Sequence, residues 1–308
     1  MKANGRAPKL GPLMTAMITP FNERGAVDLR EAGRLARWLV EQGNHGLIVC
    51  GTTGESPALS DDEKVALFRA AKEAVGDRAA IVAGTGGNNT EHSIELTERA
   101  AGEGVDAALA VVPYYNKPPQ EGMYQHFKAI SEVGPTIMYN IQGRTAINMT
   151  AATTLRCAEL PGIVGVKEAS GDLDQIGLVC AGKPVGFNVW SGDDSWTLPV
   201  MAAGGYGVIC VVSHIAGRSM RKMIEAHLKG ENDVARKIHV GLLPVIKTLM
   251  TTAANPVPIK SVLNAMGFPA GPFRLPLVPL TDDQLVAVMR TVREAGDLIT
   301  FKAGVRVA

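Results

Sequence analysis

The sequence has almost no net charge, few aromatic residues and no long apolar run, and each shortage excludes a class of protein. The formal net charge is +1 and only 20% of the residues are charged, so we expect no binding to nucleic acid or to an anionic membrane surface. The apolar run Leu13–Ile18 is too short for a membrane span or for the apolar segment of a signal peptide. Aromatic residues make up 5% of the chain and hydrophobic residues 46%, which is typical of an α/β enzyme core.

The chain also lacks the residue spacing of a metal site. Its four cysteines show no C-x-x-C pair: Cys50, Cys157, Cys180 and Cys210. Two of them lie in apolar, strand-like runs, which favours buried free thiols over metal ligands or disulfides. The six histidines show no ligand spacing either, and only His214 lies near the end of a predicted strand. We therefore expect no metal, and a reducing, cytoplasmic location.

What the sequence does contain is a regular alternation of short apolar runs and amphipathic helical patterns. The eight strand-like runs are Leu13–Ile18, Leu47–Cys50, Ala80–Ala83, Ala107–Val112, Thr136–Tyr139, Ile163–Val166, Phe187–Trp190 and Val208–Val212. The helical patterns that follow them are Asp28–Gln42, Lys64–Val75, Thr90–Glu103, Gln120–Glu132, Thr150–Glu159, Leu173–Ala181, Thr197–Ala203 and Ala216–Lys229. Such repetition predicts parallel strands covered by helices, and eight units predict a (β/α)8 TIM barrel.

An open, doubly wound sheet is the alternative architecture, but it would normally carry a glycine-rich turn after its first strand. Here Thr19-Pro-Phe-Asn22 follows that strand instead. After Gly230 the pattern becomes helical, with segments Asp233–Leu249, Pro258–Met266 and Asp282–Glu294. We predict a barrel over residues 11–230 and a C-terminal helical extension over residues 231–308, packed on the barrel.

Lys167 is the residue that points most directly to chemistry. Strand side chains alternate between two faces, so Lys167 shares a face with Gly165 and Ala169, while Val164, Val166 and Glu168 share the other. If the valines pack outward against helices, Lys167 points inward. Burial disfavours a charged ammonium, and the resulting free amine can form a Schiff base with a carbonyl substrate. The alternative is a lysine at a strand end that extends to water.

Polar residues follow the carboxyl ends of the other predicted strands, where barrel enzymes carry their active sites. They are Thr52 and Thr53, Tyr114 and Tyr115, Tyr139 with Arg144, and Gly192-Asp193-Asp194. Each has an ordinary structural explanation: loop capping for the threonines, interface packing or a core phenol for the tyrosines, and exposure for the arginine. Together they predict hydroxyls, a guanidinium and an amine at one barrel mouth, a set suited to proton transfer on a carbonyl acid. The aspartates are expected to structure their loop rather than to bind a metal.

These residues lie in motifs that resemble the dihydrodipicolinate synthase / N-acetylneuraminate lyase family. The motifs are Gly51-Thr-Thr-Gly-Glu-Ser56, Tyr114-Tyr-Asn-Lys-Pro118, Tyr139-Asn140 with Arg144-Thr145, Gly165-Val-Lys-Glu-Ala169, Gly192-Asp-Asp194 and Asn255-Pro-Val-Pro-Ile-Lys260. The likeness runs from about Thr15 to Pro279. The threonine pair, the tyrosine pair and Arg144 resemble the synthase branch more than the sugar-acid lyases.

The resemblance implies a class I condensation of pyruvate with L-aspartate 4-semialdehyde, giving 4-hydroxy-tetrahydrodipicolinate on the route to lysine. It implies that Lys167 forms a covalent imine with pyruvate, with no cofactor. On the face that they share with Lys167, Gly165 and Ala169 are expected to leave room for this pyruvate. The other implied roles are a proton relay of Tyr139, Thr52 and Tyr115; pyruvate carboxylate binding by Thr52 and Thr53; semialdehyde carboxylate binding by Arg144; and backbone contacts from Gly192 and Ile209. Tyr115 would reach a neighbouring subunit's site, in a homotetramer built as a dimer of dimers.

The chain departs from the family pattern in two places. Family members often carry Pro and Gly where this chain has Gln142 and Ala146, on either side of Arg144, so the loop is expected to be less rigid. Where lysine-inhibited relatives tend to carry His and Glu, this chain has Asp61, Lys64 and His92, from which we expect weak or absent inhibition by lysine.

Two other functions remain open from the sequence. One is a pyruvate-dependent aldolase of a sugar acid, such as N-acetylneuraminate or 2-keto-3-deoxy-gluconate. The other is a catalytically silent barrel that binds a keto acid.

Overall fold

A computed structural model describes residues 10–301 and contains a closed barrel of eight parallel strands. The strands are β1 (Leu13–Ala16), β2 (Gly46–Val49), β3 (Ala80–Gly84), β4 (Ala107–Val111), β5 (Thr136–Asn140), β6 (Ile163–Glu168), β7 (Asn188–Ser191) and β8 (Gly207–Cys210). They follow one another around the barrel in chain order. The predicted (β/α)8 barrel is therefore confirmed, and all eight predicted strands are present with ends that differ by a few residues.

Helices separate the strands along the chain, as predicted. They are α1 (Leu29–Glu41), α2 (Asp61–Val75), α3 (Thr90–Gly102), α4 (Gln120–Ser131), α5 (Gln142–Thr145), α6 (Ala151–Ala158), α7 (Leu173–Gly182), α8 (Thr197–Ala202) and α9 (Ser213–Leu228). Three further helices follow: α10 (Asn232–Thr251), α11 (Val257–Ala265) and α12 (Asp282–Glu294). A capping box begins α2, since the Ser60 hydroxyl accepts the Glu63 N–H and the Glu63 carboxylate accepts the Ser60 N–H.

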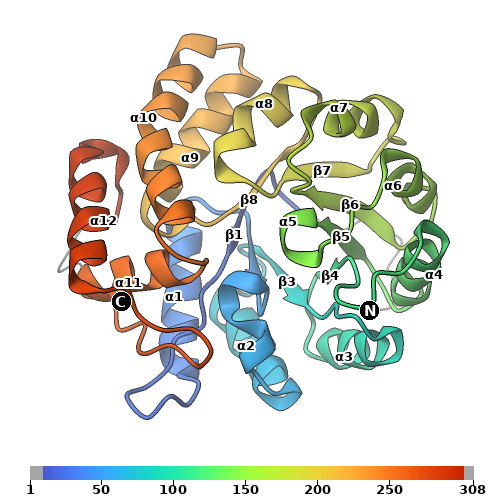
Figure 1. The fold of residues 1–308 in the computed structure, drawn as a ribbon, viewed down its shortest axis with the longest axis horizontal. Helices are drawn as coiled ribbons and strands as arrows, with labels where there is room; N and C mark the ends of the chain where they lie inside the picture. Colours follow the sequence, from blue (N-terminus) through green and yellow to red (C-terminus); the bar gives the residue numbers. More distant parts are fainter. Residues whose placement is uncertain (1–9, 302–308) are drawn as a thin grey trace. The chain divides into compact units, whose positions relative to one another are not determined.

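The described residues form two compact units. The first contains residues 10–12 and 80–209, and therefore β3 to β7, β8 up to Ile209, and α3 to α8. Figure 1 shows α3, α4, α6 and α7 on the outer side of the strands of this unit. Its core joins strand and helix side chains, with Val166 of β6 packed in one cluster with Phe127, Cys157 and Ile176. Val166 thus faces the helices, which turns its strand neighbour Lys167 to the opposite face.

The second unit contains residues 13–79 and 210–301, and therefore β1, β2, α1, α2 and α9 to α12. In this unit α10 packs against α9, α11 and α12 (Figure 1). The Thr15 hydroxyl of β1 donates to Asn44 Oδ1 at 2.6 Å and lies 2.7 Å from Ser213 Oγ of α9. The helical character after residue 230 agrees with the sequence, whereas the division into a barrel of residues 11–230 and an extension of residues 231–308 stays a prediction.

Three local predictions need correction. The sixth strand continues two residues beyond its predicted end and includes Lys167 and Glu168. The eighth strand ends at Cys210, because Val211 and Val212 turn into α9. The four-residue helix α5 was not predicted, since its sequence Gln-Gly-Arg-Thr is too short to show a helical period.

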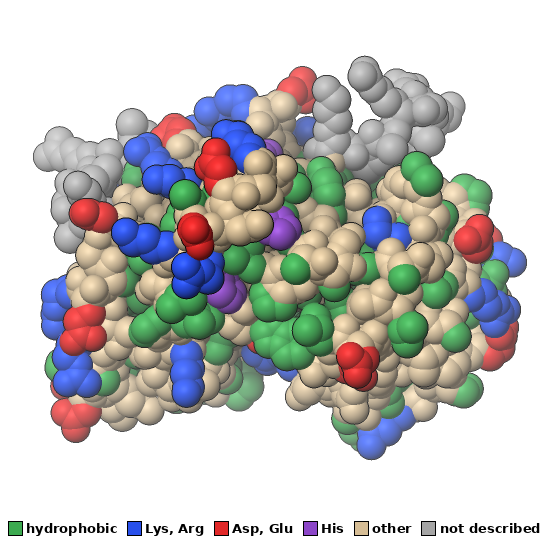
Figure 2. All heavy atoms as spheres, turned by 90° about the horizontal axis from the view of Figure 1, so that it is seen from above, with side chains coloured by type: hydrophobic (Ala, Val, Ile, Leu, Met, Phe, Trp, Pro, Cys, Tyr) green, Lys and Arg blue, Asp and Glu red, His purple; other side chains and the backbone are tan. Residues whose placement is uncertain are grey.

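Charges of both signs are interspersed on the face that Figure 2 shows, in keeping with a net charge of +1. None of the helices within residues 10–301 has both the length and the apolar character needed to cross a membrane.

His214 is a structural residue at the start of α9. Its Nδ1 lies 2.8 Å from the Val211 carbonyl oxygen, to which it donates, and its Nε2 accepts the Ile18 N–H at 3.2 Å. This neutral tautomer is complementary to both partners, and burial lowers the pKa of His214 to about 4.

The buried imidazole predicts a loss of stability in mild acid. The unfolded chain takes up a proton near pH 6.5 and the folded protein only near pH 4, so the free energy of unfolding falls as the pH drops through this window. We expect His214→Gln to be less stable at pH 7 but to show a shallower fall between these pH values. Urea titrations at several pH values measure this, with His227→Gln as the control. An unchanged slope in His214→Gln would contradict the assignment.

Candidate active site

Lys167 lies on the same face of the sheet as two aromatic side chains. The register pairs it with Tyr139 of β5 on one side and with Trp190 of β7 on the other. Because paired residues in adjacent parallel strands point to the same face, this register brings the three side chains together. The Lys167 side chain is buried, and Nζ lies 4.3 Å from the centroid of the Tyr139 ring.

The Lys167 amine has no acidic partner in its unit. Among the described residues of that unit, its only polar contact is with the face of the Tyr139 ring. A ring face stabilises a cation by about 0.5–2 kcal/mol, which is less than a buried charge loses on leaving water. Within this unit Lys167 therefore lies beside a ring and not in an ion pair, an arrangement that leaves its amine open to a carbonyl substrate.

Glu168 faces away from Lys167, as predicted, into a polar network between strand and helix. Its carboxylate accepts the Ser170 N–H at 2.8 Å and lies 3.2 Å from Asn140 Nδ2 at both oxygens. Burial raises the pKa of Glu168, although these hydrogen bonds oppose the effect. Glu168 is only 1% exposed, and its hydrogen bonds link β6 to Asn140 of β5 and to the turn at Ser170.

The expectation that Gly165 leaves room for a substrate is wrong. A Cβ at this position would lie 2.4 Å from the Asn188 carbonyl oxygen and 2.6 Å from the Trp190 ring. The missing side chain therefore accommodates β7 and the indole. The sequence could not show this, because it does not reveal which large side chain of a neighbouring strand leans over a glycine.

Gly192, in contrast, borders Lys167 directly. A Cβ on Gly192 would lie 3.2 Å from Lys167 Cε and 2.7 Å from Ala169 Cβ. The Gly192 N–H donates to the Glu168 carbonyl oxygen at 2.7 Å, which holds the turn after β7 against β6. The two aspartates after it structure this turn: Asp193 accepts from the N–H and hydroxyl of Ser195, and Asp194 is buried.

Arg144 is exposed on α5, in a loop that is fastened to β5. Asn140 Oδ1 accepts the Met149 N–H at 3.1 Å, and the Thr145 hydroxyl lies within hydrogen-bond distance of two carbonyl oxygens of the loop. Ala146, which stands where the family often has glycine, has a φ of 61°. This left-handed conformation favours glycine and costs an alanine about 1–2 kcal/mol.

Tyr115 stands apart from Lys167 and Tyr139 in exposure. It is 90% exposed and has a φ of 71°, while its neighbour Tyr114 is 40% exposed. A tyrosine held outward by a strained backbone has room to act on another chain. Ile209 is buried in β8, and its predicted contact near the lysine stays a prediction.

Thr52 and Thr53 follow β2 in the second unit, in a single 3-10 turn. Thr53 is buried and its hydroxyl accepts from Asn255 Nδ2 at 2.9 Å. Thr52 is half-buried, and its hydroxyl makes no hydrogen bond with any residue among those described. The sequence did not reveal the partners of this turn, Asn255 and Lys260, because they lie some two hundred residues further along the chain.

The described residues offer no set of ligands for a metal ion. Residues 10–301 contain no group of three or more His, Cys, Asp or Glu side chains placed to hold an ion. All four cysteines are free thiols, and burial raises the pKa of Cys157 to about 12.

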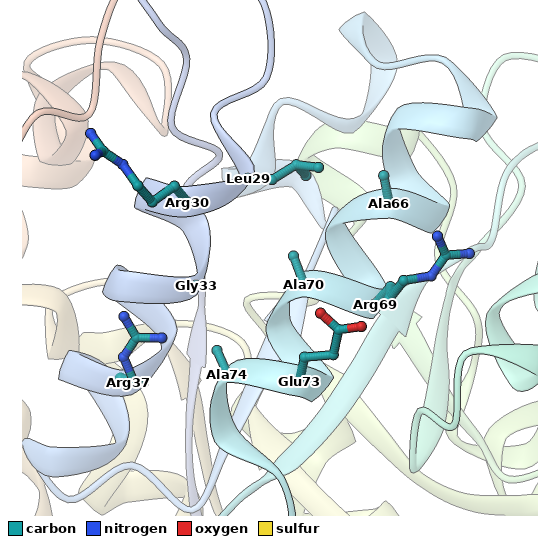
Figure 3. Close-up of a pocket in the computed structure, with 9 residues that line it drawn as sticks. All are labelled: Leu29, Arg30, Gly33, Arg37, Ala66, Arg69, Ala70, Glu73 and Ala74. Atoms are coloured by element: carbon teal, nitrogen blue, oxygen red, sulfur yellow. The ribbon is translucent and has the colours of Figure 1, made fainter.

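A separate hollow of about 420 Å³ lies between α1 and α2 in the second unit (Figure 3). Small residues on facing helices, Gly33 and Ala74 among them, leave the space, and Arg30, Arg37, Arg69 and Glu73 surround it. It contains none of the predicted site residues, and we assign it no role.

The fold and the site define the class: a (β/α)8-barrel enzyme with a buried lysine that lies against a tyrosine ring. The model of the dihydrodipicolinate synthetase family matches residues 9–295. The chain belongs to this family.

The sequences of individual relatives align with nearly the whole chain. It is 54% identical to the 4-hydroxy-tetrahydrodipicolinate synthase of Moorella thermoacetica over 288 residues, which are 93% of this chain and 98% of that protein. Its identity to the Bacillus subtilis enzyme of the same name is 48%, over 92% of this chain and 99% of that protein. The crystal structure of the Cyanidioschyzon merolae synthase with lysine bound has a TM-score of 0.91 at 42% identity and covers 93% of this chain and 98% of that one.

The contact between Gly192 and Lys167 predicts that a single methyl group disturbs the amine. In Gly192→Ala the new Cβ displaces Lys167 Cε or Ala169, and we expect capture of a small keto acid on Lys167 by borohydride to slow about 10- to 100-fold. Gly177→Ala in α7 is the matched control, because among residues 10–301 nothing outside its own helix lies within 4 Å of its Cβ position. Equal capture rates in the two variants would contradict the packing described.

Proposed function

We propose that this protein is a 4-hydroxy-tetrahydrodipicolinate synthase, which condenses pyruvate with L-aspartate 4-semialdehyde through a Schiff base on Lys167. The observation that carries the proposal is the buried Lys167 amine, which lies over the Tyr139 ring without an acidic partner in its unit. Family membership and close relatives named for this activity support it.

The reaction balances without an oxidant or a reductant. Lys167 Nζ attacks the pyruvate carbonyl carbon, and water leaves as the imine forms. Loss of a methyl proton gives an enamine, whose carbon attacks the aldehyde carbon of the semialdehyde. The semialdehyde amine then attacks the imine carbon, closes the ring and releases Lys167. One water is lost in all and no redox change occurs, so the chemistry requires no cofactor beyond the imine.

Each of these steps moves a proton, and positioned hydroxyls suit this task. Tyr139 is adjacent to the amine and is the first candidate for the relay. Thr52, whose hydroxyl has no partner among residues 10–301, and Thr53 hold the pyruvate carboxylate in this proposal, and the exposed side chain of Arg144 binds the carboxylate of the semialdehyde. Gly192 and Ile209 contribute backbone groups near the lysine.

Tyr115 gives this proposal an oligomeric requirement. Its 90% exposure in the single chain suits a phenol that enters the site of a neighbouring subunit and completes the relay there. At least a dimer is then needed, and a dimer of dimers is our proposal for the assembly.

Borohydride trapping tests the lysine. We expect pyruvate and borohydride to modify Lys167 irreversibly and to leave Lys167→Ala unmodified, as shown by mass spectrometry of peptides. Tyr139→Phe should still trap pyruvate but condense it about 10²- to 10⁴-fold more slowly, because a proton relay is broken while the amine remains.

The second substrate separates the alternatives. Pyruvate with aspartate semialdehyde should give the cyclic product, whereas N-acetylneuraminate or 2-keto-3-deoxy-gluconate should remain intact. Cleavage of a sugar acid without condensation would replace the proposed activity with that of a lyase. Absence of a pyruvate adduct on Lys167 would leave a silent keto-acid-binding barrel.

Lysine inhibition is expected to be weak or absent. Lys64 is nearly buried and its Nζ lies 3.2 Å from Asp61 Oδ1, so part of its charge is compensated, while the remainder still opposes a bound lysine ammonium. The Cyanidioschyzon merolae relative was crystallised with lysine bound. That protein is therefore a useful reference for an assay of lysine inhibition. Steady-state rates with millimolar L-lysine should stay near the uninhibited value, and micromolar inhibition would refute the expectation.

A further inference from the structure

A fully buried ion pair lies next to the Thr52–Thr53 turn. Lys260 Nζ of α11 donates to Glu55 Oε1 at 2.7 Å, and the two side chains are 0% and 1% exposed. Glu55 comes two residues after Thr53 and adopts a left-handed conformation with a φ of 56°. Such a conformation is unfavourable for glutamate and persists where surrounding contacts impose it.

Every residue from Thr53 to Glu55 forms a hydrogen bond with a residue elsewhere in its unit. Asn255 donates to the Thr53 hydroxyl at 2.9 Å, and the Thr19 hydroxyl donates to the Gly54 carbonyl oxygen at 2.7 Å. Glu55 accepts from Lys260 at one oxygen and from the Arg274 N–H, 3.1 Å away, at the other. Thr52 is the exception, because its half-buried hydroxyl is left without a partner among the described residues.

Arg274 extends this anchorage to the next turn. Its guanidinium donates to the Ala58 carbonyl oxygen at 2.8 Å and forms a two-pronged pair with Glu63 at the start of α2. The turn after Glu55 is thus tied to the same segment that supports Glu55 itself. The pair with Arg274 lowers the pKa of Glu63, so this carboxylate stays charged at neutral pH.

Stability alone does not account for the Lys260–Glu55 pair. Two charges lose a large hydration free energy when they are buried. A protein with an apolar pair of the same size in their place is therefore often as stable or more stable. Lys260 lies against aromatic rings, with Nζ 4.1 Å from the centroid of Phe21 and 5.2 Å from that of Phe273. Burial lowers its pKa to about 8 despite the opposing effect of Glu55. Such a pair instead fixes an orientation, because the Glu55 carboxylate must point at Lys260 Nζ to remain paired.

We propose that Lys260 and Glu55 are positioning residues, which hold the Thr52–Thr53 turn in the conformation that accepts the pyruvate carboxylate. The inference rests on the proposed function, since it concerns the binding of pyruvate. Neither side chain touches the substrate. Their effect passes through the backbone of residues 52–55. Hydrogen bonds fix residues 53 to 55 of this turn, while the Thr52 hydroxyl remains available to bind pyruvate.

The test compares broken and neutral versions of the pair. Lys260→Met leaves the buried Glu55 carboxylate without its cation, and we expect the KM for pyruvate to rise about 10- to 100-fold, since small displacements of binding groups have effects of this size. The KM for the semialdehyde should change much less. Glu55→Gln keeps the shape and one acceptor oxygen, so it should give the same change to a smaller extent and in a better-folded protein.

The double variant Lys260→Met/Glu55→Gln separates positioning from stability. It contains no buried charge at this place, so its melting temperature should recover toward that of the native protein. The raised KM for pyruvate should persist, because the directional contact is still missing. Recovery of the KM together with the melting temperature would overturn the inference, as would an unchanged KM in folded Glu55→Gln.

Val288→Ala in α12 is the matched control for destabilisation. Val288 is fully buried in the same unit, and its truncation should lower the melting temperature while leaving the KM for pyruvate unchanged. Borohydride trapping of pyruvate by the native protein distinguishes the two proposals. If the native protein traps pyruvate and the Lys260 and Glu55 variants bind it normally, only the positioning role fails; if the native protein does not trap it, the proposed function fails as well.

Discussion

The register of three neighbouring parallel strands is the constraint on which the site depends. It sets Tyr139, Lys167 and Trp190 side by side on one face of β5, β6 and β7. Val166, one residue before the lysine, packs among helix side chains on the other face. A shift by one residue would exchange the two faces, burying the amine among the helices and turning the valine inward. Helix packing on one side therefore enforces the position of the amine on the other.

Buried polar groups form hydrogen bonds behind the segments that are proposed to bind the substrate. Behind β6, Glu168 and Asn140 join the strand to the loop that carries Arg144. Behind the turn after β2, Lys260 and Glu55 do the same for Thr52 and Thr53. Both networks bury ionisable side chains, which adds little to stability, but each gives a loop a single favoured conformation. In the proposed site, the positions of the binding groups thus depend on charged side chains that lie behind them.

The sequence predicted the barrel and much of the candidate site because two short-range rules sufficed. Strand alternation identified the face of Lys167, and the order of strands and helices placed the polar residues after strand ends. Where the interpretation failed, longer-range packing was responsible. Gly165 was expected to leave space for a ligand, yet the indole of Trp190 and the backbone of Asn188 occupy it. Helix α5 was missed because four residues carry no period.

By itself, the sequence determined the parallel strands and their helices and singled out Lys167 as the candidate nucleophile, because each of these follows from local periodicity and residue chemistry. Only the tertiary structure decided that Lys167 lies over Tyr139, that Gly192 borders its side chain, and that Glu55 meets Lys260 from the far end of the chain. The reason is physical: contacts between residues on different strands and helices depend on how strands pair and helices pack, and no local pattern records them.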